Sequence, residues 1–133
     1  LLEKQKNNFK INLNINESGT YKLYDRNIKF EVTNSSSFVL NENKNVAQLD
    51  LNKIKFPLKI RNWKKGDSFK PLGMKKNKKV SDFLIDKKVP NYIKIFQCVI
   101  LSDNNIVWLI DHQIHDEYKV TNKTKKVFNI SVN

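Results

Sequence analysis

The sequence has one cysteine and three glycines among its 133 residues, and both scarcities exclude classes of site. The lone thiol, Cys98, cannot form an internal disulfide. No cationic residue stands within its apolar run IFQCVIL, so we expect a buried structural thiol rather than a nucleophile. Three glycines leave little material for a nucleotide-cradling loop, and the sequence contains no GxxxxGKS/T motif, no GxGxxG motif and no nucleophile elbow.

Long hydrophobic runs are also missing. The longest apolar stretches fall far short of the roughly 20 residues that a membrane-spanning helix needs, and no signal peptide is present. We therefore expect no membrane partner and a cytoplasmic location. The chain starts LLEKQKNN without an initiator methionine, which we interpret as the mark of a fragment of a longer protein.

Acidic residues are scarce relative to basic ones. Twenty-five Lys and Arg stand against thirteen Asp and Glu, which gives a net charge of +12 and a pI near 9.8. This balance favours a polyanionic partner, namely nucleic acid, an anionic membrane surface or an acidic protein. The alternative origin of the positive charge is a low-GC coding bias, which the abundant Asn, Lys and Ile indicate. The charge is uneven, however, since residues 61–94 hold eleven basic and three acidic residues.

Arginine is almost absent, Arg26 and Arg61 being the two examples. Lysine contacts phosphate as a hydrated point charge, whereas arginine gives the planar, bidentate contacts that read base edges. The composition therefore favours recognition of a nucleic-acid backbone by its shape. Because nearly all other basic residues are lysines, we expect that position 61 requires the planar guanidinium group of arginine.

Alternating apolar residues predict a strand-rich α+β domain over residues 1–133, with 1–8 as a lead-in. Phe9, Ile11, Leu13 and Ile15 share one face of the first strand, and Glu17-Ser18-Gly19 turns the chain. Asp25-Arg26-Asn27 connects the next two strands, residues 34–45 form a loop, and Asp103-Asn104-Asn105 is a strong turn signal. The further strands are predicted at 20–25, 27–33, 46–51, 55–63, 94–102, 105–110 and 125–133.

One principal helix is predicted from Ser81 to about Lys88. Ser81 is a suitable N-cap, Asp82 favours the positive end of the helix, and Lys87 and Lys88 favour its negative end. Val80 is placed to staple onto the first turns, at Leu84 or Ile85, and Val89-Pro90 stops the helix.

Catalytic and metal-binding side chains do not form a complete set. His112 and His115 lie in IDHQIHDEY near three carboxylates, but the stretch reads as extended or turning and no motif fixes a third ligand. We interpret both as solvated turn residues, with a small metallohydrolase as the weakest alternative. Asp67 is better explained as a turn residue after Gly66, and Asp82 as a helix N-terminal residue.

The basic segment carries the strongest functional signal. Gly66 and Gly73 are expected where the backbone turns sharply or takes a positive φ, so the turns would hold the neighbouring cations in a fixed arrangement. Four lysines within positions 75–79 repel one another unless an anion neutralises them, and the helix N-terminus adds N–H groups. Trp63 and Phe69 either stack on bases or anchor the core. The candidate contact residues are Arg61, Lys64, Lys65, Lys70, Lys75, Lys76, Lys78, Lys79, Lys87, Lys88 and Lys94.

The run IRNWKKGDSFKPLGMKKNKKVSDFLIDKKVP resembles the C-terminal domain of bacterial tRNA(Ile)-lysidine synthetases. The shared features are Arg61, Gly66-Asp67, Pro71-Leu72-Gly73, Lys78-Lys79 and Asp82-Phe83, followed by Pro90 and the strand IVWLI. The resemblance is close over residues 56–130. Two positions depart from the family pattern: Lys94 stands where an Arg is usual, and Asp111-His112-Gln113 stands where Gly-x-Arg is usual.

The resemblance implies a fold, an activity and partners. The fold would be a β-sandwich of unusual topology with a helical layer, shared with a domain of the phenylalanyl-tRNA synthetase beta subunit. The activity would be a ligase that uses ATP and Mg²⁺ to attach lysine to the wobble cytidine of an isoleucine tRNA with a CAU anticodon. Its catalysis would lie in an N-terminal domain with a Ser-Gly-Gly-x-Asp-Ser loop, which this sequence lacks.

This chain would then be a tRNA-binding domain without catalytic residues, metal or cofactor of its own. Arg61 would serve as a phosphate or structural clamp, and the tRNA and the enzyme's own catalytic domain would be the partners, with a homodimer left open. The rival interpretation is a structural module that docks on a catalytic domain or a partner subunit without touching RNA.

Overall fold

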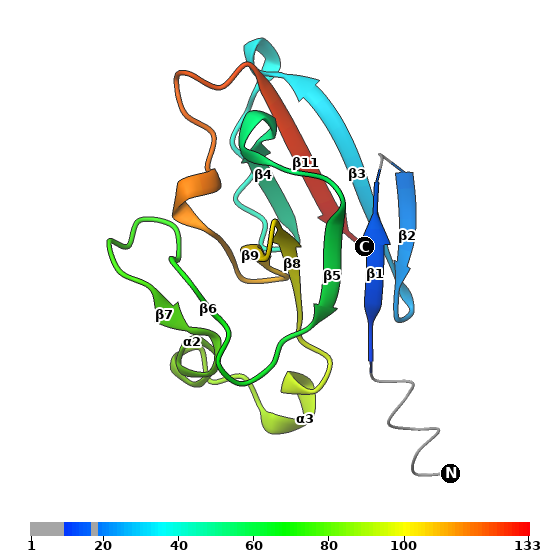
Figure 1. Ribbon diagram of the computed structural model, residues 1–133, viewed down its shortest axis with the longest axis vertical. Coiled ribbons are helices and arrows are strands. Elements are labelled where there is room, and N and C mark those ends of the chain that lie inside the picture. Colours follow the sequence, from blue (N-terminus) through cyan, green and yellow to red (C-terminus); the bar gives the residue numbers. More distant parts are fainter. Residues whose placement is uncertain (1–9, 17–18) are drawn as a thin grey trace.

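Strands rather than helices build residues 10–16 and 19–133, the part of the chain that the computed structural model describes (Figure 1). They form two antiparallel sheets that pack face to face and a separate two-stranded hairpin. The predicted positions Phe9 and Glu17-Ser18 and the lead-in 1–8 lie outside the described residues.

The first sheet has five strands and lies in the middle of the domain. Its third strand is buried at every position because both faces of the sheet are covered. In spatial order the strands are β1 (Asn12–Ile15), β5 (Leu58–Asn62), β8 (Cys98–Ser102), β9 (Asn105–Leu109) and β10 (Gln113–Ile114).

The second sheet has four strands and one exposed face. Alternation of buried and exposed positions along its longest strand places Ile28 and Phe30 in the core and the intervening Lys29 and Glu31 in solvent. In spatial order the strands are β2 (Gly19–Leu23), β3 (Arg26–Asn34), β11 (Lys126–Val132) and β4 (Val46–Asp50).

A third layer covers the outer face of the first sheet. It consists of the hairpin β6 (Ser68–Phe69) and β7 (Lys78–Lys79) and the helix α2 (Val80–Asp86). Phe69, Phe83 and Leu84 from this layer pack on Val99 and Leu101 of β8, whose alternate residues face the second sheet. The α+β sandwich with one helical layer, expected from the sequence, is the architecture observed.

The predicted strands are confirmed in the described part of the chain, with shifts at their ends. The largest is in the strand predicted at 94–102, which begins at Cys98 because Asn91–Lys94 is a short helix. The hairpin between β2 and β3 turns at Tyr24-Asp25, one residue earlier than predicted, because Arg26 already pairs with Leu23. The turn after β8 is built on Asp103 and Asn104, which both have positive φ (50° and 65°). This pair of dihedrals matches the right-handed twist of the strands that it joins.

The N-cap of the predicted helix was placed two residues too late. Lys79, not Ser81, is the N-cap, and no side chain caps the helix. Lys79 pairs with Ser68 in the small hairpin, which keeps its backbone extended until the helix begins at Val80. Val80 is therefore a buried helical residue, and the expected staple to Ile85 is wrong because Ile85 is 59% exposed.

Several short elements were not predicted. They are the two-residue strands β6, β7 and β10, the helix α3 (Asn91–Lys94), directly after Pro90, and three 3₁₀ turns, η1 (Ser35–Ser37), η2 (Leu51–Lys53) and η3 (Asp116–Tyr118). A four-residue helix has no sequence periodicity to detect, which explains the omission. None of the described helices is long and apolar enough to cross a membrane.

Candidate nucleic-acid interface

Arg61 and Asp67 fix the first turn of the basic segment. Two nitrogens of the Arg61 guanidinium donate to the two carboxylate oxygens of Asp67, at 2.8 and 3.0 Å, and one of them also donates to the carbonyl of Asn62 at 3.0 Å. Asp67 further accepts the Lys64 amide at 2.8 Å, which closes the turn around Gly66 at φ +96°. The predicted roles of Asp67 and Gly66 as turn residues are confirmed.

The electrostatics of this pair make it a structural clamp. The Arg61 and Asp67 side chains are 16% and 8% exposed. Burial alone would raise the pKa of the Asp67 carboxyl, but the hydrogen bonds from Arg61 and from the Lys64 amide, with the charges of both residues, lower that pKa below its usual range. Both nitrogens at the end of the Arg61 guanidinium already donate to Asp67. Of the two roles expected for Arg61, the geometry therefore favours the structural clamp over the phosphate contact.

The second turn, at Gly73, is held by residues 114–116, which were expected to belong to a solvated turn. Gly73 has φ +83°, as expected, and its amide donates to the carboxylate of Asp116 at 2.9 Å. The Leu72 amide donates to the carbonyl of Ile114 at 3.1 Å, and Pro71 forms a bridge with His115. The loop that carries the clustered lysines is therefore anchored at its base. In the sequence, only the acidic pair Asp116-Glu117 indicates that this segment could contact the basic loop.

Three of the eleven predicted cations are engaged within the domain. Arg61 pairs with Asp67, Lys70 with Glu117 at 3.0 Å, and Lys78 with Asp86. No ion pair joins the other eight to any residue in 10–16 or 19–133. These eight, which we name the lysine end, are Lys64, Lys65, Lys75, Lys76, Lys79, Lys87, Lys88 and Lys94.

The lysine end occupies one part of the molecule. The turn after β5, the β6–β7 hairpin, α2 and α3 all lie in the lower half of Figure 1. Seven of its eight side chains are exposed, Lys94 being half-buried. Lys87 is the one with a local partner, since its ammonium lies 5.5 Å from the centroid of the Phe83 ring. The extra N–H groups expected at the α2 N-terminus are not all free, because the Val80 amide donates to the carbonyl of Asp67 at 2.9 Å.

Two aromatic residues of the basic segment, Trp63 and Phe69, are core anchors. Phe69 is 1% exposed and packs edge-on against Phe83. Trp63 is half-buried against the same apolar cluster, and its indole N–H donates to the carbonyl of Lys94 at 2.9 Å. Stacking on bases is thereby wrong for Phe69, and the Trp63 ring instead ties α3 to the end of β5.

The two histidines lie on either side of β10. Burial lowers the pKa of both below the usual histidine range. His115 accepts the Glu117 amide through Nδ1 at 3.1 Å, and His112 packs edge-on against Phe83. Within the described residues no three His, Cys, Asp or Glu side chains gather as metal ligands. Both are half-buried, so the prediction that they are solvated is corrected.

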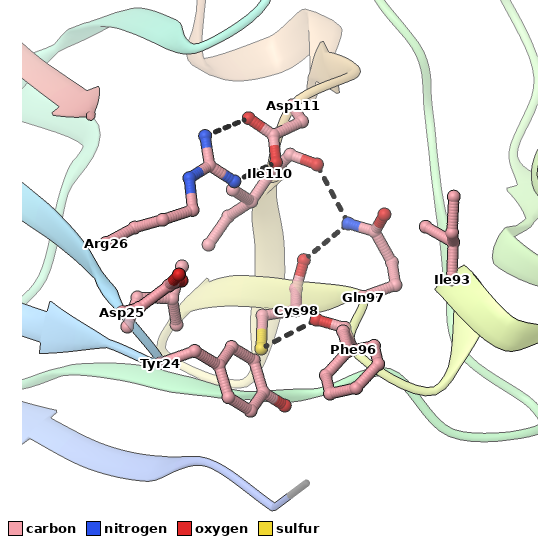
Figure 2. A pocket seen from close by; sticks show the side chains of 10 residues that line it. Tyr24, Asp25, Arg26, Ile93, Phe96, Gln97, Cys98, Ile110 and Asp111 are labelled. Atoms are coloured by element: carbon pink, nitrogen blue, oxygen red, sulfur yellow. Dashed lines mark hydrogen bonds and ion pairs between the residues drawn. The ribbon is translucent and has the colours of Figure 1, made fainter.

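A cavity of about 270 Å³ lies between the β2–β3 turn and the start of β8 (Figure 2). At its rim Arg26 donates to both oxygens of Asp111, at 2.5 and 2.9 Å, and Asp111 has a φ of +68°, in the region that favours glycine. Gln97 donates to the carbonyls of Cys98 and Ile110 at 2.9 and 2.8 Å. Cys98 is 2% exposed, which confirms the predicted buried thiol, and burial raises its pKa to about 12.

Comparisons with known proteins show the family of this chain. A family model described as the TilS substrate C-terminal domain matches residues 58–131. The tRNA(Ile)-lysidine synthase of Parabacteroides distasonis is 38% identical over 90 residues, 68% of this chain and 20% of that protein. The tRNA(Ile)-lysidine synthase of Clostridium tetani is 31% identical over 106 residues, 79% of this chain and 23% of that protein. The chain therefore spans about a fifth of the length of the curated relatives it matches.

A solved structure shares the architecture. The crystal structure of a TilS C-terminal domain superposes with a TM-score of 0.80 over 93% of this chain and 96% of that chain, at 13% sequence identity. At this identity the likeness shows the fold alone. It confirms the strand-rich sandwich expected from the sequence, and the family match confirms the resemblance drawn from the motifs.

Proposed function

Because this chain belongs to the TilS substrate C-terminal domain family, we propose that it is the tRNA-binding domain of a tRNA(Ile)-lysidine synthetase. The observation that carries the proposal is the lysine end, where eight cations without a carboxylate partner in the described residues surround two rigid turns. Rigid turns limit the entropy lost when the ammonium groups meet phosphates.

The binding mode follows from the type of cation. Lysines suit contact with backbone phosphates better than planar, bidentate reading of base edges, and an A-form stem presents phosphates across its wide minor groove. If about five phosphates are neutralised, the logarithm of the binding constant falls with the logarithm of salt concentration with a slope of roughly −3.5 to −4.5. The partner would be an isoleucine tRNA with a CAU anticodon, held by its body.

The ligase chemistry belongs outside this chain. Among the described residues, no group of His, Cys, Asp or Glu side chains is placed to bind a metal. Gly66 and Gly73 lie in turns that are closed by the carboxylates of Asp67 and Asp116, and not in a phosphate-binding loop between a strand and a helix. In our proposal ATP and Mg²⁺ serve an N-terminal catalytic domain that activates the wobble cytidine for attack by lysine. The domain described here would bind the tRNA and position it for that catalytic domain.

Charge reversal at the lysine end tests the proposal. We would replace Lys75, Lys76 and Lys79 by glutamate, leaving Lys78 because it pairs with Asp86. The matched control reverses three exposed lysines on other strands, listed here: Lys22, Lys29 and Lys59. In gel-shift titrations at about 100 mM KCl we expect at least about tenfold weaker tRNA binding for the first variant, and less than about threefold for the control. Equal affinities of the two variants would refute the placement.

A docking module is the second candidate, favoured by exposed apolar side chains beside the cavity of Figure 2. The first described strand begins there, since the Ile11 amide donates to Asn62, whose side chain donates to the carbonyl of Ile95. The occupant would be the catalytic portion of the same protein. The exposed side chains are Tyr92, Ile93, Ile95 and Phe96, between 42% and 72% exposed. No binding of tRNA by wild-type chain at low salt would leave docking as the function.

A further inference from the structure

A basic cavity lies at the far end of the molecule from the lysine end (Figure 1). It has a volume of about 730 Å³ and opens between η2 and the loop that leads into β11. Both segments lie at the upper end of Figure 1, whereas α2 and α3 lie at the lower end. Four lysines line it, none of them among the predicted contact residues: Lys53, Lys123, Lys125 and Lys126.

Buried polar contacts hold Asp50 and Thr121, two residues that line this cavity. Thr124 and Asp50 are 5% and 6% exposed, and the Thr124 hydroxyl donates to the Asp50 carboxylate at 3.1 Å. The same hydroxyl accepts the Thr121 amide at 2.9 Å, and the Thr121 hydroxyl accepts the Lys123 amide at 3.2 Å. The second oxygen of Asp50 accepts the Asn52 amide at 3.0 Å. These contacts hold the loop on β4, so its lysines project from a fixed backbone.

The charge inside the cavity is not balanced. Asp50 is its only acidic lining residue, and both of its carboxylate oxygens already accept hydrogen bonds within the domain. Lys53 donates to the backbone carbonyl of Glu117 at 2.9 Å, which leaves its charge uncompensated. Lys123, Lys125 and Lys126 are exposed and form no ion pair with any residue of 10–16 or 19–133.

We propose that this cavity is a phosphate-binding site, distinct from the lysine end, which takes a backbone phosphate of the bound RNA or a free phosphate. Like charges that share one concave site repel one another, and an anion in the site removes that repulsion. Freely solvated surface lysines would need neither the buried Asp50–Thr124 contact nor a common cavity. The acidic residues Asp116 and Glu117 of η3 lie between Lys94 of the lysine end and Lys123 of the cavity along the chain.

Inorganic phosphate provides a test that does not depend on RNA. In an amide NMR titration with sodium phosphate, against sodium chloride of equal ionic strength, we expect saturable shifts confined to residues 50–54 and 121–126. The variant Lys123→Glu, Lys125→Glu, Lys126→Glu should lose these shifts while its urea midpoint stays close to that of the wild type. Shifts that the variant retains, or that chloride reproduces, would overturn the phosphate site.

The RNA arm rests on the proposed function. At about 100 mM KCl the triple variant should bind tRNA roughly five- to tenfold more weakly than the Lys22, Lys29, Lys59 reversal, and its salt slope should be smaller by about 1, as expected for the loss of one phosphate contact. Weaker binding with phosphate shifts supports an RNA backbone ligand, and unchanged tRNA affinity with phosphate shifts supports a free phosphate. If wild-type chain binds no tRNA, the proposed function fails, and the phosphate titration still decides this site. Absence of both effects refutes it.

Discussion

Replacing Arg61 by lysine should destabilise the domain and leave the RNA affinity of the folded protein unchanged. The guanidinium is 16% exposed and reaches both oxygens of the Asp67 carboxylate, at 2.8 and 3.0 Å. A lysine ammonium can approach one of these oxygens but cannot form two parallel hydrogen bonds. Arg61→Lys therefore keeps the positive charge and removes the clamp.

The size of the effect follows from the burial of the pair. A hydrogen bond to a charged group contributes roughly 1.5–3 kcal/mol, so Arg61→Lys should lower the free energy of unfolding by about 2 kcal/mol. Arg61→Met leaves the 8% exposed Asp67 carboxylate without a cation, which costs about 3–5 kcal/mol. Adding Asp67→Leu to Arg61→Met removes the orphaned charge and should recover part of this loss, with a coupling energy of about 2 kcal/mol.

The pH dependence of stability has a definite sign. The folded-state pKa of Asp67 is lowered, so its contribution is complete above the ordinary aspartate pKa of about 3.9 and is lost as pH falls through the lowered value. The wild type should therefore lose stability more steeply than Arg61→Met below about pH 4. Parallel curves for the two proteins would contradict this assignment.

Urea unfolding followed by the fluorescence of Trp63 and Trp108 measures these changes. The dependence of free energy on urea should stay constant, since the same surface is exposed on unfolding. Gel-shift titrations on the folded variants then separate stability from binding. The reasoning is refuted if Arg61→Lys unfolds within about 0.5 kcal/mol of the wild type, or if it binds tRNA at least about tenfold more weakly.

Two further predictions concern the cavity of Figure 2. Asp111 has φ +68° and pairs with a half-exposed Arg26, so Asp111→Ala should cost about 1–2 kcal/mol, whereas Asp111→Gly should cost less than about 1 kcal/mol because glycine tolerates this backbone. Urea unfolding of the pair checks this, and an alanine variant as stable as the glycine variant would contradict it. With a pKa of about 12, Cys98 should react with a disulfide reagent at pH 8 only as the protein unfolds. Rapid labelling without urea would show an accessible thiolate instead.

Local sequence patterns predicted the elements that depend on local geometry. Alternation at Ile11, Leu13 and Ile15 identified β1, and the positive φ of Gly66 and Gly73 followed from residue type. The N-terminus of α2 could not be placed in this way. Its first residue is set by pairing of Lys79 with Ser68, a contact between segments eleven positions apart. Such pairing overrides the capping preference of serine.

The sequence by itself determined the strand periodicity, the glycine turns, the excess of positive charge and the family, because each depends on residue type and spacing along the chain. Only the tertiary structure decided which cations are available to a ligand. Arg61 is occupied because folding brings the Asp67 carboxylate within 2.8 Å, while Lys53 and Lys123 share a cavity although seventy residues separate them. Charge pairing depends on distance through space, and that distance is set when the sheets pack.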